Sequence, residues 1–504
     1  MVIIIYSAET EKSIMANMGL PEYSYFFVLK KFRAILCKFA TVVEVNNPET
    51  EVDIIYEECR TRGVPCLFFS FSPPHKTVTG LKCLTISVFA WEFTTIPTDT
   101  WGGNSRNDWR NVFSKHGCAI THSSFAVRAV QKAMGNDFPV WSIPAPLWDD
   151  YTKLYRKEET AAQLKEFDLT YKGSLIDFKG CDAQSVSEES RNDFIKQRSS
   201  PQKDKNTNLH LKGIIYTTVL NPDDGRKNWT DLLQGFIWAF RKLEDVTLVL
   251  KVIYHDFEKV RGTVTDEIFK LMPFQCRVVI LHGYLNDNEY AKLIQESTYV
   301  VKTAHGEGQC LPLMEYMSAG KPAIAPSHTA MEDYINKGNS FVVKSSLERS
   351  IWPHDPRGAL RTFRYRINWE SLYNAYLESY SVAKNDPGRY SRMSGCAVES
   401  LKKYCSKAVV EERLINVFQQ CGVPREVILS STPIKERKSL RRILLFRIWR
   451  FRLFSKESSF FREPVKTRLL RLLAFSRKCY VWFKNKSIEK VGRLIEKDQR
   501  GRAS

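Results

Sequence analysis

Short apolar runs alternate with segments of helical spacing along most of this chain. Val2–Tyr6, Cys66–Phe71 and Cys83–Phe89 are such runs, and Tyr25–Phe39 between the first two has the spacing of an amphipathic helix. Short runs without polar alternation are typical of strands that are buried on both faces, as in parallel sheets covered by helices. Residues 1–150 are therefore predicted to form a doubly wound, Rossmann-like α/β domain.

The same alternation begins again near residue 208. Lys212–Leu220, Val246–Ile253 and Arg277–Leu281 are predicted strands, and Asn228–Leu243 is a predicted helix. Residues 208–425 are thus predicted to form a second Rossmann-like domain that ends in helices. Two such domains facing a cleft bind ligands at the carboxyl ends of their parallel strands.

Two segments fall outside this alternation. Residues 151–207 are rich in Lys, Glu, Ser, Gln and Asp, so we expect a polar insertion or linker there. Residues 426–504 are predicted to form a basic, amphipathic helical extension. Of the net charge of +19, residues 430–504 carry +16, from 22 basic and 6 acidic residues. The basic character therefore belongs to the tail and not to the body of the protein.

The tail mixes these cations with bulky apolar residues. Leu440–Phe454 places Arg among Leu, Ile, Phe and Trp, a composition that suits insertion at an anionic bilayer surface. The alternative is a set of helices packed on the body with a solvated basic face. The sequence shows no signal peptide and no apolar run long enough to span a bilayer. We therefore expect a cytoplasmic protein that is peripheral at the inner face of the membrane.

The segment Tyr299–Tyr334 carries the most chemical information. A predicted strand ends in a loop with two glycines, and a predicted helix follows, with Pro312 in its first turn and Gly320 just past its end. Free N–H groups at the start of such a helix offer a site for a diphosphate. Glu307 on the loop and Glu315 on the helix would hold hydroxyl groups on either side of it.

This segment resembles the E-x7-E motif of retaining glycosyltransferases of family 4 (glycosyl transferases group 1), which have the GT-B fold and build bacterial surface polysaccharides. The resemblance implies that Glu307 contacts the donor sugar and Glu315 the ribose, with Gly308 and Leu311 at the same donor site. The alternative is a surface helix on which the two glutamates are solvated and have no functional role.

A basic pair follows the first strand of the second domain. Arg226 and Lys227 lie in the turn Asn221–Trp229, before a predicted helix. The resembled family places a basic pair here against the donor diphosphate, where cations stabilise the charge of the leaving group. Together with Glu307, these residues are the predicted catalytic groups. The alternative is a basic turn on the surface.

The first domain offers weaker signals. Val88–Phe93, with Trp101 beyond it, resembles a segment of polysaccharide-building members of the family, and Met18–Leu20 resembles their glycine-bearing acceptor loop. Glu92 and Gly19 are accordingly the predicted acceptor-binding residues. His75, His122 and His305 are more often structural in such positions, and none is assigned a role.

The predicted function is transfer of a sugar, with retention of configuration, from a nucleotide-sugar to a glycan or lipid-linked acceptor. The resemblance implies no metal and no cofactor, and residues 430–504 would bind an anionic membrane. One alternative is an inactive nucleotide-sugar-binding scaffold for another transferase. The other is a nucleic-acid-binding protein acting through its tail, which a body of net charge +3 disfavours.

Overall fold

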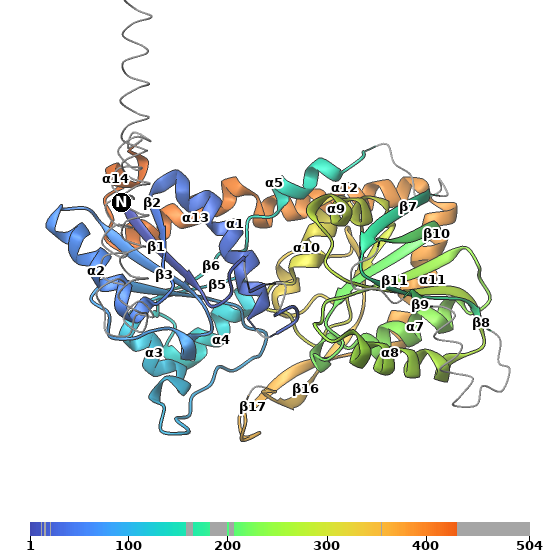
Figure 1. Ribbon diagram of the computed structural model, residues 1–504, viewed down its shortest axis with the longest axis horizontal. Coiled ribbons are helices and arrows are strands. Elements are labelled where there is room, and N and C mark those ends of the chain that lie inside the picture. The colour runs from blue at the N-terminus through green and yellow to red at the C-terminus, as the bar shows by residue number, and fades with distance from the viewer. Residues whose placement is uncertain are drawn as a thin grey trace, which may run out of the picture. The chain divides into compact units, whose positions relative to one another are not determined.

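A computed structural model describes residues 1–157, 165–181, 199–200, 206–353 and 355–430, apart from positions 12, 15, 16 and 21. The first sheet has six parallel strands in the order β2-β1-β3-β4-β5-β6 (Figure 1). Their bounds are Val2–Ser7 (β1), Thr41–Glu44 (β2), Cys66–Phe71 (β3), Leu84–Phe89 (β4), Ala119–Thr121 (β5) and Val140–Ser142 (β6).

Helices cover this sheet. They are Tyr23–Phe39 (α1), Pro48–Thr61 (α2), Trp109–His116 (α3) and Ser124–Met134 (α4). Phe32 and Leu36 of α1 are fully buried in one cluster with Ile3 and Ile5 of the central strand. The predicted doubly wound domain is confirmed, and we call this part the N-terminal lobe.

The second sheet has nine strands. From β15 to β12 it runs in the order β15-β14-β13-β10-β11-β12, all parallel, and the antiparallel strands β8 and β9 follow while β7 pairs with β10. The parallel strands are Asn206–Leu220 (β10), Val246–Val252 (β11), Phe274–His282 (β12), Tyr299–Val301 (β13), Ala323–Ala325 (β14) and Ser340–Val342 (β15). This sheet and its helices form the C-terminal lobe.

The prediction of a linker at 151–207 is wrong for part of that segment. Lys165–Lys172 (β7) and Ser174–Cys181 (β8) are strands of the second sheet, Ser199–Ser200 (β9) pairs with β8, and β10 begins at Asn206. Alternation explains β7, because Phe167, Leu169 and Tyr171 are buried and the residues between them are exposed. A strand with one solvated face has a polar composition. It resembles a linker unless the two-residue alternation of its apolar side chains is recognised.

Helices cover the second sheet and then return to the first. They are Trp229–Phe240 (α7), Phe257–Leu271 (α8), Asp287–Glu296 (α9), Leu311–Ser318 (α10), Trp369–Asn385 (α11), Pro387–Cys405 (α12), Lys407–Gln420 (α13) and Arg425–Leu429 (α14). Phe418 of α13 packs against Phe39 and Phe69 of the N-terminal lobe, with ring centroids 5.7 and 6.3 Å apart. The described residues accordingly lie within one compact unit.

A hairpin of the C-terminal lobe also reaches the N-terminal lobe. Its strands are Ser345–Ile351 (β16) and Arg361–Ile367 (β17), which no sequence pattern predicted. Trp352 at its tip is buried, and its ring lies 5.7 Å from that of Trp91 and 6.3 Å from that of Trp109. The hairpin thus fixes the segment that carries Glu92.

The basic extension at 431–504 lies outside the described residues. Among those that the structure describes, no helix combines the length and the apolar character that crossing a membrane requires.

Candidate active site

The loop between β13 and α10 holds Glu307 in a fixed backbone position. Its N–H donates to the hydroxyl of Thr329 at 3.1 Å, and its carbonyl accepts from the N–H of Ala330 at 3.1 Å. Cys310 ends the loop with a φ of 64°, in the left-handed region, just before α10 begins at Leu311. These constraints direct the Glu307 side chain to the carboxyl ends of β10 and β13.

Glu307 is buried and paired with two lysines. Lys227 Nζ lies 2.9 and 3.0 Å from its two carboxylate oxygens, and Lys302 Nζ lies 3.2 Å from Oε1. Burial favours the neutral acid, but Lys227 and Lys302 outweigh it and hold the pKa of Glu307 well below its usual range. Glu307 is therefore a fixed negative charge at neutral pH.

The turn before α7 places Arg226 beside two further carboxylates. Arg226 Nη2 donates to Asp224 Oδ2 at 2.7 Å, and Nη1 lies 2.5 Å from Glu92 Oε1. Burial opposes the charge of Arg226, yet Glu92 and Asp224 raise its pKa. Burial also raises the pKa of Glu92, and the charge of Arg226 works against that rise.

These groups form one network that we call the charge cluster. It contains Glu92, Asp224, Arg226, Lys227, Lys302 and Glu307. Its three cations match its three carboxylates, and the Glu92–Arg226 pair joins the N-terminal lobe to the C-terminal lobe. An anion that binds here must share these cations with the carboxylates that already contact them.

Glu315 lies in separate surroundings. Its carboxylate accepts hydrogen bonds from the hydroxyls of Tyr151 at 3.1 Å and Tyr290 at 2.7 Å. Burial raises the pKa of Glu315, and the hydrogen bond from Tyr290 opposes the rise. Leu313 and Met317 on the same helix are buried. The two glutamates of the motif thus sit in different environments, one among cations and one among phenols.

The glycines of the loop allow the backbones of the two lobes to approach each other closely. A Cβ on Gly308 would lie 2.7 Å from Ala90 Cβ, and one on Gly306 would lie 3.0 Å from the Glu92 carbonyl oxygen. Gly19 has a φ of 85°, and its carbonyl accepts from Asn221 Nδ2 at 2.8 Å. The predicted acceptor loop therefore touches the segment that carries Arg226.

The histidines have structural partners. His122 Nδ1 contacts the Ile143 carbonyl at 2.9 Å, and His305 Nδ1 contacts the Tyr365 carbonyl at 2.8 Å. His75 stacks on Trp109 with ring centroids 5.9 Å apart. Burial lowers the pKa of His122 to about 4, so this ring stays neutral.

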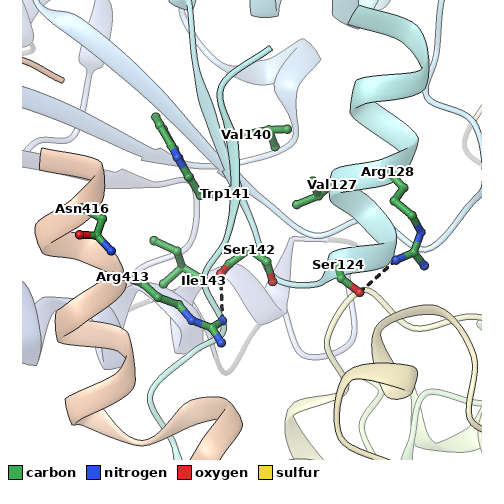
Figure 2. A pocket seen from close by; sticks show the side chains of 9 residues that line it. All are labelled: Ser124, Val127, Arg128, Val140, Trp141, Ser142, Ile143, Arg413 and Asn416. Carbon is green, nitrogen blue, oxygen red and sulfur yellow. Dashed lines mark hydrogen bonds between the residues drawn. The ribbon is translucent and has the colours of Figure 1, made fainter. Parts of the chain in front are cut away.

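A pocket of about 460 Å³ lies apart from the charge cluster. Figure 2 shows it between α4, β6 and α13, with Arg413 and Arg128 on either side. Arg413 Nη1 donates to the Ser142 carbonyl at 3.0 Å, and Arg128 pairs with Glu332. None of the predicted site residues lines this pocket.

Sequence reasoning predicted Arg226, Lys227 and Glu307 at one donor site and Glu92 at an acceptor site, whereas the structure brings all four together; other members of the site were missed. Lys302 and Asp224 complete the charge cluster, and Tyr290 and Tyr151 hold Glu315. Lys302 left one signal, because a lysine between a buried strand and a glycine loop has little access to water. The tyrosines left none.

Residues 276–351 match the family described as glycosyl transferases group 1. This segment contains Lys302, Glu307 and Glu315. No protein of curated function matches the chain. Among solved structures, a glycosyltransferase from Rickettsia africae is similar at 11% identity with a TM-score of 0.50, over 86% of this chain and 99% of that one.

The chain has the two-domain GT-B fold, and its segment 276–351 matches the glycosyl transferases group 1 family. HepE from Anabaena, in complex with UDP and glucose, is similar at 11% identity with a TM-score of 0.47, over 83% of this chain and 100% of HepE. TarM from S. aureus, in a complex that includes UDP, is similar at 12% identity with a TM-score of 0.43. That match covers 72% of this chain and 58% of TarM, so the chain spans little more than half of that protein.

Proposed function

We propose that this transferase moves a sugar from a nucleotide-sugar donor to a glycan or lipid-linked glycan acceptor, with retention of configuration. One observation carries the proposal: Arg226 and Lys227 meet Glu307 at the carboxyl ends of parallel strands. Parallel α/β sheets bind ligands at that edge. Retention rests on the resemblance to family 4, and the anomeric configuration of the product, read by NMR, tests it.

Arg226 and Lys227 have the chemistry for the donor diphosphate. A guanidinium binds phosphate oxygens in a fork, and an ammonium acts as a point charge. As the nucleoside diphosphate departs, charge develops on it, and fixed cations stabilise that charge without reorganisation. We assign Glu307 to the donor sugar. We assign Gly308 and Leu311 to the same donor site.

Glu315 suits the ribose of the donor. Its carboxylate already accepts two hydrogen bonds from tyrosine hydroxyls, at 2.7 and 3.1 Å. A carboxylate has about four lone-pair positions, so it can accept a ribose hydroxyl in addition. Tyr151 and Tyr290 would then fix its orientation.

The acceptor would enter from the N-terminal lobe, where Glu92 and Gly19 face the C-terminal lobe. We propose that transfer needs no metal ion, because the cations of the charge cluster supply the charge that a metal would provide. Activity that persists after dialysis against EDTA would support this, and loss restored by Mg²⁺ or Mn²⁺ would refute it.

Calorimetry with UDP, GDP and ADP tests the donor site. We expect tight binding of one nucleotide, and a loss of about 1.5–3 kcal/mol for each charged contact removed in Arg226→Ala/Lys227→Ala. Lys384→Ala/Arg389→Ala is the matched control, because it removes the same charge from the surface of α11 and α12. A folded protein that binds no nucleotide would contradict the proposal. Nucleotide binding without sugar transfer to any acceptor would favour the alternative of an inactive scaffold.

We further propose that residues 430–504 attach the enzyme to an anionic membrane at the inner face. The support is the charge of +16 among bulky apolar residues. Sedimentation with vesicles of phosphatidylglycerol, compared with phosphatidylcholine, tests it with the full chain and with a chain that ends at Ser430. Equal sedimentation of both chains would refute the assignment, and tail-dependent binding to DNA but not to vesicles would favour nucleic acid.

A further inference from the structure

Lys302 is a buried lysine that sequence reasoning did not connect with the site. It directly follows β13, it is 5% exposed, and its N–H donates to the Ile324 carbonyl at 2.9 Å. Its ammonium donates to the Val219 carbonyl at 3.3 Å and lies 3.2 Å from Glu307 Oε1. The side chain therefore joins the ends of two strands to the inner side of the Glu307 loop.

The two lysines on Glu307 differ in position. Lys227 contacts both carboxylate oxygens and belongs to the same turn as Arg226, and its side chain is 16% exposed. Lys302 contacts one oxygen, and its side chain is 6% exposed. Of the two, Lys227 is the cation that can turn to a ligand beside Arg226, whereas Lys302 is confined behind Glu307.

This difference matters once a diphosphate arrives. If Lys227 were the sole partner of Glu307, its move to the phosphates would leave a buried carboxylate unpaired, which is strongly unfavourable. We propose that Lys302 is a positioning residue that keeps Glu307 ionised and in place while Lys227 engages the donor diphosphate. The inference rests on the proposed donor site and adds Lys302 to it.

A second buried lysine shows what a purely structural role looks like. Lys251 is the penultimate residue of β11, which is separated from β13 by β10; it is 5% exposed and donates to the carbonyls of Gly283 at 2.5 Å and Val252 at 3.2 Å. No carboxylate appears among its contacts in the described part of the chain. Lys251→Met is therefore a matched control for Lys302→Met, with the same change in a similar setting.

Other ionisable groups surround Glu307 and must be considered in any proton measurement. Asp224 and Glu92 lie across the charge cluster, Cys310 ends the loop, and His328 and Tyr334 face Glu307 from the segment after β14. Burial raises the pKa of Cys310 to about 11 and lowers that of His328 to about 4, so neither exchanges protons near neutral pH.

The test is nucleotide binding by calorimetry of the full chain, with UDP, GDP and ADP, in buffers of different ionisation enthalpy. The buffer dependence gives the protons taken up per nucleotide bound. For Lys302→Met we expect an affinity at least ~10-fold weaker at pH 8, with an uptake that approaches one proton as Glu307 loses Lys227. The deficit should shrink towards pH 6. Wild type, Lys302→Arg and Lys251→Met should bind alike, without that uptake.

A second comparison tests the inference if the single variant Lys302→Met folds poorly. In a Glu307→Gln background, adding Lys302→Met should change nucleotide affinity by less than about threefold, because the two side chains act as a unit. Wild-type affinity without proton uptake in Lys302→Met would overturn the inference while the donor site stands. Failure of the wild type to bind any nucleotide would instead overturn the proposed function, and the role of Lys302 with it.

Discussion

Glu92 is predicted to oppose nucleotide binding, although its position suits an acceptor contact. Its Oε1 lies 2.5 Å from Arg226 Nη1, and Asp224 Oδ2 lies 2.7 Å from Nη2 of the same guanidinium. A donor diphosphate must share that guanidinium. Glu92→Gln keeps the shape of the side chain and removes its charge, so the cluster gains one net positive charge.

The magnitude follows from the geometry. A diphosphate oxygen and the Glu92 carboxylate on one guanidinium would lie about 5 Å apart, and an effective dielectric constant near 20 gives a repulsion of about 3 kcal/mol. The wild type relieves part of this by turning Glu92 towards water, since that side chain is 11% exposed. We expect about half to remain, so Glu92→Gln should bind the nucleotide about tenfold more tightly.

Calorimetry with the preferred nucleotide measures this change. Asp99→Asn is the control, because Asp99 lies in the same segment but pairs with Arg357 at 3.6 Å, outside the charge cluster. Its affinity should stay within about twofold of the wild type. If Glu92 also contacts the acceptor, Glu92→Gln should lower kcat while the nucleotide binds more tightly. Unchanged or weaker nucleotide binding would refute the competition.

Three further changes test the architecture. Gly308→Ala should destabilise by about 1–3 kcal/mol in urea unfolding, because its Cβ would lie 2.7 Å from Ala90 Cβ, whereas Gly262→Ala, with open space in α8, should not. Trp352→Ala should cost about 3–5 kcal/mol by the same assay, against less than about 0.5 kcal/mol for the exposed Phe363→Ala on the same hairpin. Burial lowers the pKa of Lys251 from 10.5 to about 7, so between those pH values the unfolded chain binds a proton that the folded chain lacks, and wild-type stability rises with pH. Lys251→Met should therefore exceed the wild type in stability most below pH 7, by up to about 5 kcal/mol, and an advantage that does not shrink as pH rises would contradict this.

Local signals were enough for the elements that frame the site. Cys66–Phe71 was predicted with the bounds that the structure has, since it is a mostly apolar run, and the helix Leu311–Ser318 was predicted from Pro312 in its first turn and Gly320 past its end. Thr41–Glu44 was missed because four residues give too short a pattern, and Lys165–Lys172 because its solvated face made it look like a linker.

The site itself could be predicted only as far as strand ends locate it. Arg226 and Glu307 follow strands β10 and β13, which are neighbours in a parallel sheet, so their meeting was foreseeable. The partner of Arg226 was not, because Glu92 lies 134 positions earlier, in the loop after a strand of the other sheet. Pairing across the lobes depends on how the hairpin and the glycine loop seat the N-terminal lobe, and no local pattern encodes that.

The balanced charges of the cluster give donor recognition a particular character. Its three cations already hold three carboxylates, so a diphosphate gains only the difference between its own contacts and those it displaces. Each displaced carboxylate then needs another stabilising environment. Glu92 is partly exposed to water, and Glu307 can keep Lys302, whereas Asp224 is tied to the Arg226 turn because its Oδ1 accepts from the Arg226 N–H at 3.1 Å. Selectivity for a diphosphate over smaller anions would follow, because only a ligand that engages Arg226 and Lys227 together offsets both exchanges.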